Sequence, residues 1–80
     1  MDLISEYLII VYELDDIQEA GLDNKRTVKR NNKLADRLRT IAFEIESGHS
    51  EIKSNFYQLL FHEKPSVRSW VAHHILEVMN

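Results

Sequence analysis

The sequence contains no cysteine, a single proline and only two glycines among its 80 residues. Without cysteine, neither disulfide bonds nor thiolate metal sites can reinforce the fold. Gly21 and Gly48 stand far apart, so the chain has no glycine-rich loop of the kind that cradles phosphates. Stability must therefore come from the packing of secondary structure, supplemented by oligomerisation or by a partner.

Long apolar runs are also missing. The longest covers residues 7–12, far fewer than the roughly 20 residues that a helix needs to cross a bilayer. The first residues show no cationic segment followed by an apolar stretch and a cleavage site. Together with the lack of cysteine, these features predict a cytoplasmic protein with no place in a membrane.

The length predicts one domain that spans residues 1–80. The hydrophobic fraction of 44% is ordinary for a globular protein and argues against disorder. A chain of this size buries only about 60% of the surface that it exposes when unfolded, so we expect a thin core.

Apolar residues recur at helical spacing and predict an all-α fold with helices at about 3–20, 26–46, 51–62 and 66–79. The connections are short, so successive helices should lie antiparallel as a stack of hairpins. Gly21 suits the end of the first helix, and Gly48 suits a left-handed position after the second. Residues 8–12 also have the composition of a strand, but the sequence holds no second such run to pair with it.

The starts of the predicted helices carry recognisable signals. Asp2 can cap the first helix, and either Asn24 or Thr27 can begin the second. Ser50 can cap the third. Pro65 cannot continue that helix, but it fits the first turn of the fourth.

The fourth predicted helix is apolar almost all round. Its polar stripe consists of Ser69, His73 and Glu77. A helix of this kind is normally buried against more than one neighbour. We therefore expect it at the centre of the fold, with Val71 and Ile75 buried.

One segment resembles the second helix of a HEAT repeat: in residues 64–76, KPSVRSWVAHHIL, a proline precedes Val-Arg, and a small or apolar pair and then an apolar pair ending in leucine follow. Residues 56–60, FYQLL, resemble the first helix of the same repeat. Upstream, residues 32–34 together with Leu38, Ile41 and Ala42 resemble the middle of a family of short bacterial HEAT-like proteins of unknown function. The likeness covers residues 28–79.

This resemblance implies a HEAT-like four-helix fold. It also implies an association with bacterial toxin genes, because some small HEAT-like proteins serve as immunity proteins. One position departs from the pattern, since Lys64 stands where the family usually has a capping aspartate before the proline. The loss of that cap would cost about 1 kcal/mol unless Ser66 caps one residue later.

Charge is distributed unevenly along the chain. Residues 1–24 hold seven carboxylates and no lysine or arginine, whereas residues 25–39 hold seven basic side chains and one aspartate. A chain polarised in this way either pairs with itself or presents one charged side to a partner.

The outward face of the first helix is the leading candidate for a partner-binding surface. Ile9 points away from the apolar side of that helix and lies among Glu6, Tyr12, Glu13 and Asp16. Apolar contact would supply affinity, and the carboxylates would steer a basic partner such as a nuclease toxin. The alternative is a solvated face with one exposed isoleucine, which is common.

The second helix offers a basic face, formed by Arg26, Arg30, Lys33 and Arg37. Three interpretations remain open. The basic side chains pair with the acidic first helix, they bind a protein or lipid anion, or they bind nucleic acid as a small regulator would. The negative net charge of −3 argues against nucleic acid.

The sequence does not predict an enzyme, a cofactor or a metal site. His73 and Glu77 are spaced i, i+4, but a helix-surface hydrogen bond explains this pair more simply than a shared ion. His74 is expected to pack near Trp70. Arg68 is expected to tie its helix to Glu63 or to a carbonyl of the preceding helix.

Three aromatic residues lie off the main apolar sides of their helices, namely Phe43, Tyr57 and Phe61. They either join the second and third helices to the fourth or, if they are exposed, favour a homodimer.

Overall fold

The computed structural model describes residues 2–21 and 23–79, with side chains through residue 78. The described residues form α1 (Leu3–Ala20), α2 (Lys25–Glu46), α3 (Ser50–Tyr57), the short 3₁₀ helix η1 (Gln58–Phe61) and α4 (Pro65–Met79). The predicted all-α class and four helices are therefore confirmed. Residues 8–12 belong to α1, so the strand alternative is wrong.

Side-chain caps fix the starts of the two long helices. The backbone N–H of Ser5 donates to Asp2 Oδ1 over 2.7 Å, and that of Thr27 donates to Asn24 Oδ1 over 2.9 Å. Asn24, not Thr27, is thus the cap of α2. Gly21 ends α1 at φ +100°, a conformation that a side chain would disfavour.

Two predicted helix ends are wrong. Gly48 does not have a positive φ. Instead, α2 tightens at its end, where the Gly48 N–H donates to the carbonyl of Ile45, so no left-handed residue is needed. Ser50 is already the first residue of α3, and His49 precedes it in an extended conformation without a side-chain cap bond. The third predicted helix also divides, because η1 replaces its last turn before Pro65.

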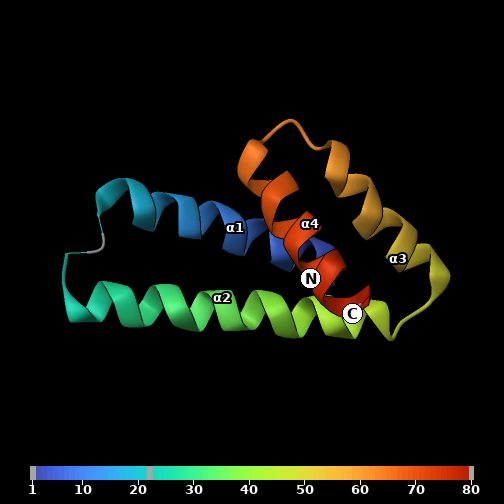
Figure 1. Cartoon of the computed structure of the whole chain (residues 1–80), viewed down its shortest axis with the longest axis horizontal. Helices are drawn as coiled ribbons and strands as arrows, with labels where there is room; N and C mark the ends of the chain where they lie inside the picture. The colour runs from blue at the N-terminus through green and yellow to red at the C-terminus, as the bar shows by residue number, and fades with distance from the viewer. Residues whose placement is uncertain (1, 22, 80) are drawn as a thin grey trace.

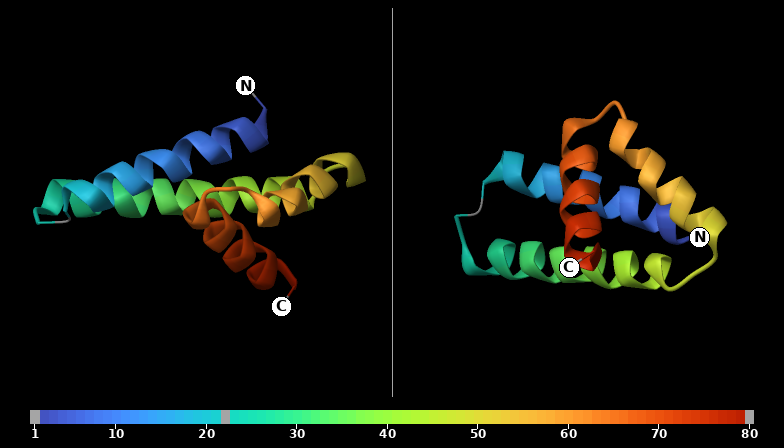
Figure 2. Two further views of the ribbon diagram at one scale, coloured as in Figure 1. Left: turned by 90° about the horizontal axis from the view of Figure 1, so that it is seen from above. Right: turned by 45° about the vertical axis from the view of Figure 1, so that its right-hand side comes forward.

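The helices form a long hairpin with a shorter pair laid against one end. Figure 1 shows α1 and α2 side by side and antiparallel, and Figure 2 shows α4 crossing both of them. The chain from α3 through η1 then lies beside α4. The other end of the hairpin extends past α4 as a two-helix projection, here called the arm and defined as residues 16–21 and 23–33.

The core lies where α4 covers the hairpin. All four helices contribute buried apolar side chains, which are Tyr7, Ile10, Val11, Leu14, Leu38, Ile41, Ala42, Ile45, Phe56, Val67 and Val71. At its centre the rings of Tyr7 and Phe56 meet edge to face, with centroids 5.1 Å apart. No described residue of the arm is buried.

Helix α4 contacts every other described helix, but one of its sides is exposed to solvent. It touches α1, α2, α3 and η1. Val71 is buried as predicted, and Ile75 is partly buried. Leu76, however, is 63% exposed. The expected burial of α4 against more than one neighbour is therefore confirmed, but α4 lies across the surface of the hairpin, and its outward side, which includes Leu76, remains exposed.

Candidate protein-binding surface

Ion pairs join the predicted acidic face of α1 to the predicted basic face of α2. Arg37 donates from Nε and Nη2 to the two carboxylate oxygens of Glu6, over 2.8 and 3.1 Å. Arg30 Nη2 lies 2.9 Å from Glu13 Oε2. The Arg37 hydrogen bond lowers the pKa of Glu6 and raises that of Arg37. Self-pairing, one of the three interpretations, thus accounts for two residues of each face.

The remaining residues of the acidic face stay at the surface. Ile9 is 52% exposed and Tyr12 is 44% exposed, and Asp16 is exposed one turn further along α1. Their i, i+3, i+7 spacing puts all three on one side of the helix. The structure therefore brings together an apolar pair and a carboxylate, with Glu6 and Glu13 beside them as members of ion pairs.

The beginning of α4 borders this surface. Lys64 Nζ lies 5.3 Å from the centroid of the Tyr12 ring and 3.2 Å from Asp15 Oδ2. Ser66 Oγ donates to Asp15 Oδ2 over 2.6 Å, so this serine ties α4 to α1 and does not cap α4. Sequence reasoning missed this border, because no periodicity links residues 12–15 to residues 64–66.

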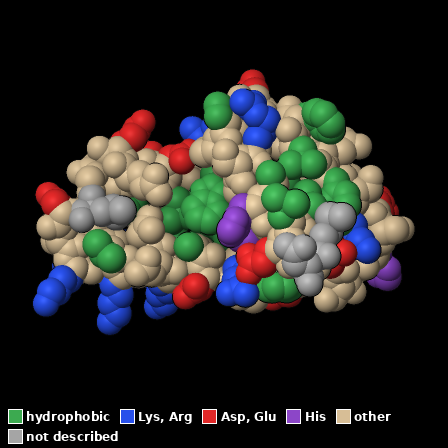
Figure 3. Space-filling view, viewed as in Figure 1, with side chains coloured by type: hydrophobic (Ala, Val, Ile, Leu, Met, Phe, Trp, Pro, Cys, Tyr) green, Lys and Arg blue, Asp and Glu red, His purple; other side chains and the backbone are tan. Residues whose placement is uncertain are grey.

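The rest of the basic face lies on the arm. Arg26 and Lys33 are exposed, and among the described residues neither takes part in a salt bridge. Figure 3 shows lysine and arginine side chains projecting from the α2 edge of the molecule. These cations remain available to an anionic partner.

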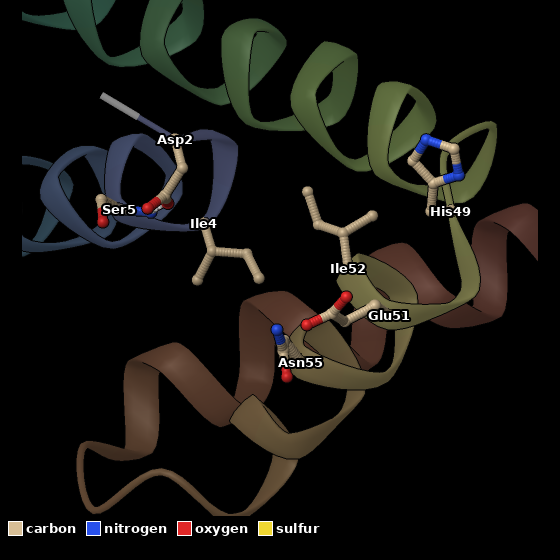
Figure 4. Close-up of a pocket in the computed structure, with 7 residues that line it drawn as sticks. All are labelled: Asp2, Ile4, Ser5, His49, Glu51, Ile52 and Asn55. Carbon is tan, nitrogen blue, oxygen red and sulfur yellow. Dashed lines mark hydrogen bonds between the residues drawn. The ribbon is translucent and has the colours of Figure 1, made fainter.

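A pocket of about 440 Å³ lies between the starts of α1 and α3. Its lining consists of Asp2, Ile4, Ser5, His49, Glu51, Ile52 and Asn55. Figure 4 shows the two isoleucines on facing helices, with the carboxylate of Glu51 and the amide of Asn55 on the α3 side. Apolar walls edged by carboxylates can accept the stem and head of a basic side chain. Helical spacing could not reveal this pocket, since it forms only when α1 and α3 meet.

A polar contact is buried in the core. The Tyr7 hydroxyl and His74 Nδ1 lie 2.6 Å apart and share a hydrogen bond. The Trp70 ring stacks on the His74 ring with centroids 5.8 Å apart, so the predicted packing of His74 near Trp70 is confirmed. Burial lowers the pKa of His74 to about 4 and raises the pKa of the Tyr7 phenol. The imidazole is therefore neutral at physiological pH.

Two other contacts were predicted for α4. His73 Nε2 lies 3.6 Å from Glu77 Oε2, so the i, i+4 pair is close, but the predicted helix-surface hydrogen bond is not made. Arg68 Nη1 donates to the carbonyl oxygens of His62 and Glu63, over 2.7 and 3.2 Å. Arg68 therefore ties α4 to the chain that precedes it, as expected.

The three off-face aromatic residues have different surroundings. Phe43 is 42% exposed and Phe61 is 87% exposed, so neither joins its helix to the core. Tyr57 is partly buried, and its hydroxyl donates to Glu46 Oε2 over 3.2 Å, which ties α3 to α2. Phe43 and Phe61 are therefore exposed, which is the condition that we expected to favour a homodimer.

No family model, curated protein or solved structure matches this chain. None of the helices in the described part of the chain is both long and apolar enough to cross a membrane.

Proposed function

We propose that this chain is a non-catalytic protein-binding module, and specifically a bacterial immunity protein that neutralises a toxin through the outward face of α1. The observation that carries the proposal is the joint exposure of Ile9 and Tyr12 on one side of a helix whose other apolar residues up to Leu14 face the core. An exposed aliphatic and aromatic pair within a polar rim is typical of a binding patch.

The chemistry of the patch favours a basic partner. Asp16 and the half-exposed Glu13 stand beside the apolar pair and would steer a cationic surface toward it. Glu6 and Glu13 already pair with α2, so Ile9, Tyr12 and Asp16 are the main recognition residues. An acidic surface can occlude the lysine-rich and arginine-rich site of a nuclease without chemistry of its own.

The toxin itself enters the proposal through the resemblance of residues 28–79 to short bacterial HEAT-like proteins. A HEAT-like arrangement of the hairpins is part of the same proposal. The exposed Phe43 and Phe61 allow the module to act as a homodimer as well, which sedimentation of the purified chain would measure.

The test needs a candidate toxin, which a toxin reading frame adjacent to the gene of this chain would supply. The combined variant Ile9→Ala, Tyr12→Ala and Asp16→Lys should weaken binding at least 100-fold, since two anchors are truncated, and should abolish protection of growth. A matched control, Arg26→Gln with Lys33→Gln, alters the other face and should bind normally. Full protection by the α1 variant would show that this face is the wrong one.

The alternative is a small nucleic-acid-associated regulator that uses the basic face. It is favoured by the exposed, unpaired cations of the arm described above. Phosphate contacts weaken steeply as salt rises. A mobility-shift assay at low salt should therefore show retardation that Arg26→Gln with Lys33→Gln removes. No retardation at low salt would eliminate this alternative.

A further inference from the structure

Three possible metal ligands lie together near the end of α4, one exposed, one buried and one partly buried. Atoms of His73, His74 and Glu77 that could each ligate an ion lie within 4.8 Å of one another. Glu77 follows His73 by four residues and His74 by three, the two spacings that put side chains on one side of a helix. The sequence predicted a simple His73–Glu77 pair, because His74 was expected to pack near Trp70.

Contacts with neighbouring side chains hold the His74 ring in an orientation that suits metal binding. Its Nδ1 is held 2.6 Å from the Tyr7 hydroxyl, and Trp70 stacks on its ring, so the imidazole cannot turn freely. In the tautomer that donates Nδ1–H to the Tyr7 oxygen, the lone pair of Nε2 is free for a metal. Histidine ligands in metal sites almost always donate their other ring N–H in this way.

A second contact orients the carboxylate. Arg39 Nη2 lies 2.6 Å from Glu77 Oε1, while Glu77 Oε2 faces His73 Nε2 at 3.6 Å. One oxygen of Glu77 is thus occupied by α2, and the other is directed at the histidines. His73 is exposed and can rotate toward the same point.

We propose that His73, His74 and Glu77 bind one Zn²⁺ ion, with Tyr7 and Arg39 as positioning residues. Two imidazoles and one carboxylate form a ligand set that suits zinc and leaves a fourth position for water. The ion would connect the end of α4 to α1 through His74 and Tyr7, and to α2 through Glu77 and Arg39. This site is independent of the proposed toxin binding, because it lies on α4 and uses none of the recognition residues of α1.

The test is a zinc titration of the untagged, chelator-treated chain by calorimetry, with Co²⁺ absorption as a report on the ligands. We expect one zinc per chain and a rise in the unfolding temperature on binding, since a ligand of the native state stabilises it. The variants His73→Ala and Glu77→Gln should each weaken binding at least tenfold. Both alter residues outside the core, so they should still fold.

Two further variants separate a built site from adventitious binding. Tyr7→Phe keeps the ring but removes the hydroxyl, and it should weaken binding by about 10-fold to 100-fold, as loss of such a partner usually does. His49→Gln with His62→Gln removes the two histidines outside the cluster and should leave binding unchanged. The proposal is overturned if zinc fails to bind at one equivalent, or if Tyr7→Phe and His73→Ala bind as the original chain does.

Discussion

The four-helix end and the arm are built from the same two long helices, yet they are held together differently. At the four-helix end, α4 seals the hairpin, and side chains such as Tyr7, Leu38 and Ile41 are fully buried. In the arm no described residue is buried, and the Glu13–Arg30 ion pair lies at its base. Pairing of α1 with α2 alone therefore leaves apolar side chains exposed to solvent. The core forms only where α4 packs on the hairpin as a further layer.

This contrast predicts that the two ends differ in local stability. A region with few buried contacts opens locally at low free-energy cost. The arm, which holds the exposed Arg26 and Lys33, should therefore open more readily than the four-helix end. The rigid end holds Ile9 and Tyr12 on a helix whose opposite side is anchored in the core.

The largest expected effect comes from removing a core ring. Tyr7→Ala should destabilise the fold by at least about 3 kcal/mol, because it leaves a cavity beside Phe56 and takes a hydrogen-bond partner from His74. Val28→Ala in the arm should change the free energy of unfolding by less than about 0.5 kcal/mol. Urea denaturation measures both. Equal losses would mean that the arm is part of the core.

The next effect is a loss of stability in mild acid that originates only at the four-helix end. The folded state keeps the pKa of His74 at about 4, whereas the usual value is 6.5. As pH falls below 6.5, His74 takes up a proton in the unfolded chain but not in the folded chain. The free energy of unfolding should therefore drop by about 2 kcal/mol between roughly pH 7 and pH 5.

Denaturation at several pH values tests this drop. His74 faces Tyr7 of α1, Arg39 of α2 and its neighbours His73 and Glu77. His73→Ala should retain the drop, and His74→Phe, which keeps an aromatic ring, should lose it. A drop that persists in folded His74→Phe would assign the effect to another group.

A smaller effect tests whether the arm opens by itself. Asn24→Ala removes the cap of α2 and should cost about 1 kcal/mol. Native-state hydrogen exchange should then accelerate roughly fivefold for amides of the arm and stay unchanged around Tyr7. His49→Ala is the matched control, because His49 makes no side-chain cap bond. Equal acceleration throughout the chain would show that arm and core unfold together.

The smallest effect concerns the ion pair at the base of the arm. Arg30 and Glu13 are both substantially exposed, so their coupling in a double-mutant cycle of Arg30→Gln and Glu13→Gln should be below about 1 kcal/mol. Salt should weaken it further. A coupling well above this value would mean that charge, and not the α4 layer, holds the hairpin together.

The acidic face of α1 and the basic face of α2 show what could not be predicted from the sequence. Helical phase placed Glu6 and Glu13 with Ile9, and Arg30 with Arg37, and these groupings are real on their own helices. Phase could not tell that the two faces would pair with each other, because that depends on the register in which α1 and α2 lie side by side. The structure pairs Glu6 with Arg37 and Glu13 with Arg30, which accounts for part of each face and leaves Arg26 and Lys33 exposed.

The sequence by itself determined the helices, because propensity, spacing and caps such as Asp2 and Asn24 act within a few residues along the chain. It also identified Ile9 as pointing away from the core. Only the tertiary structure decided that Tyr7 meets His74, that Leu76 stays exposed on α4, and that a pocket opens between α1 and α3. Those outcomes depend on the angle at which α4 crosses the hairpin, which is set by side chains from distant parts of the chain packing at once.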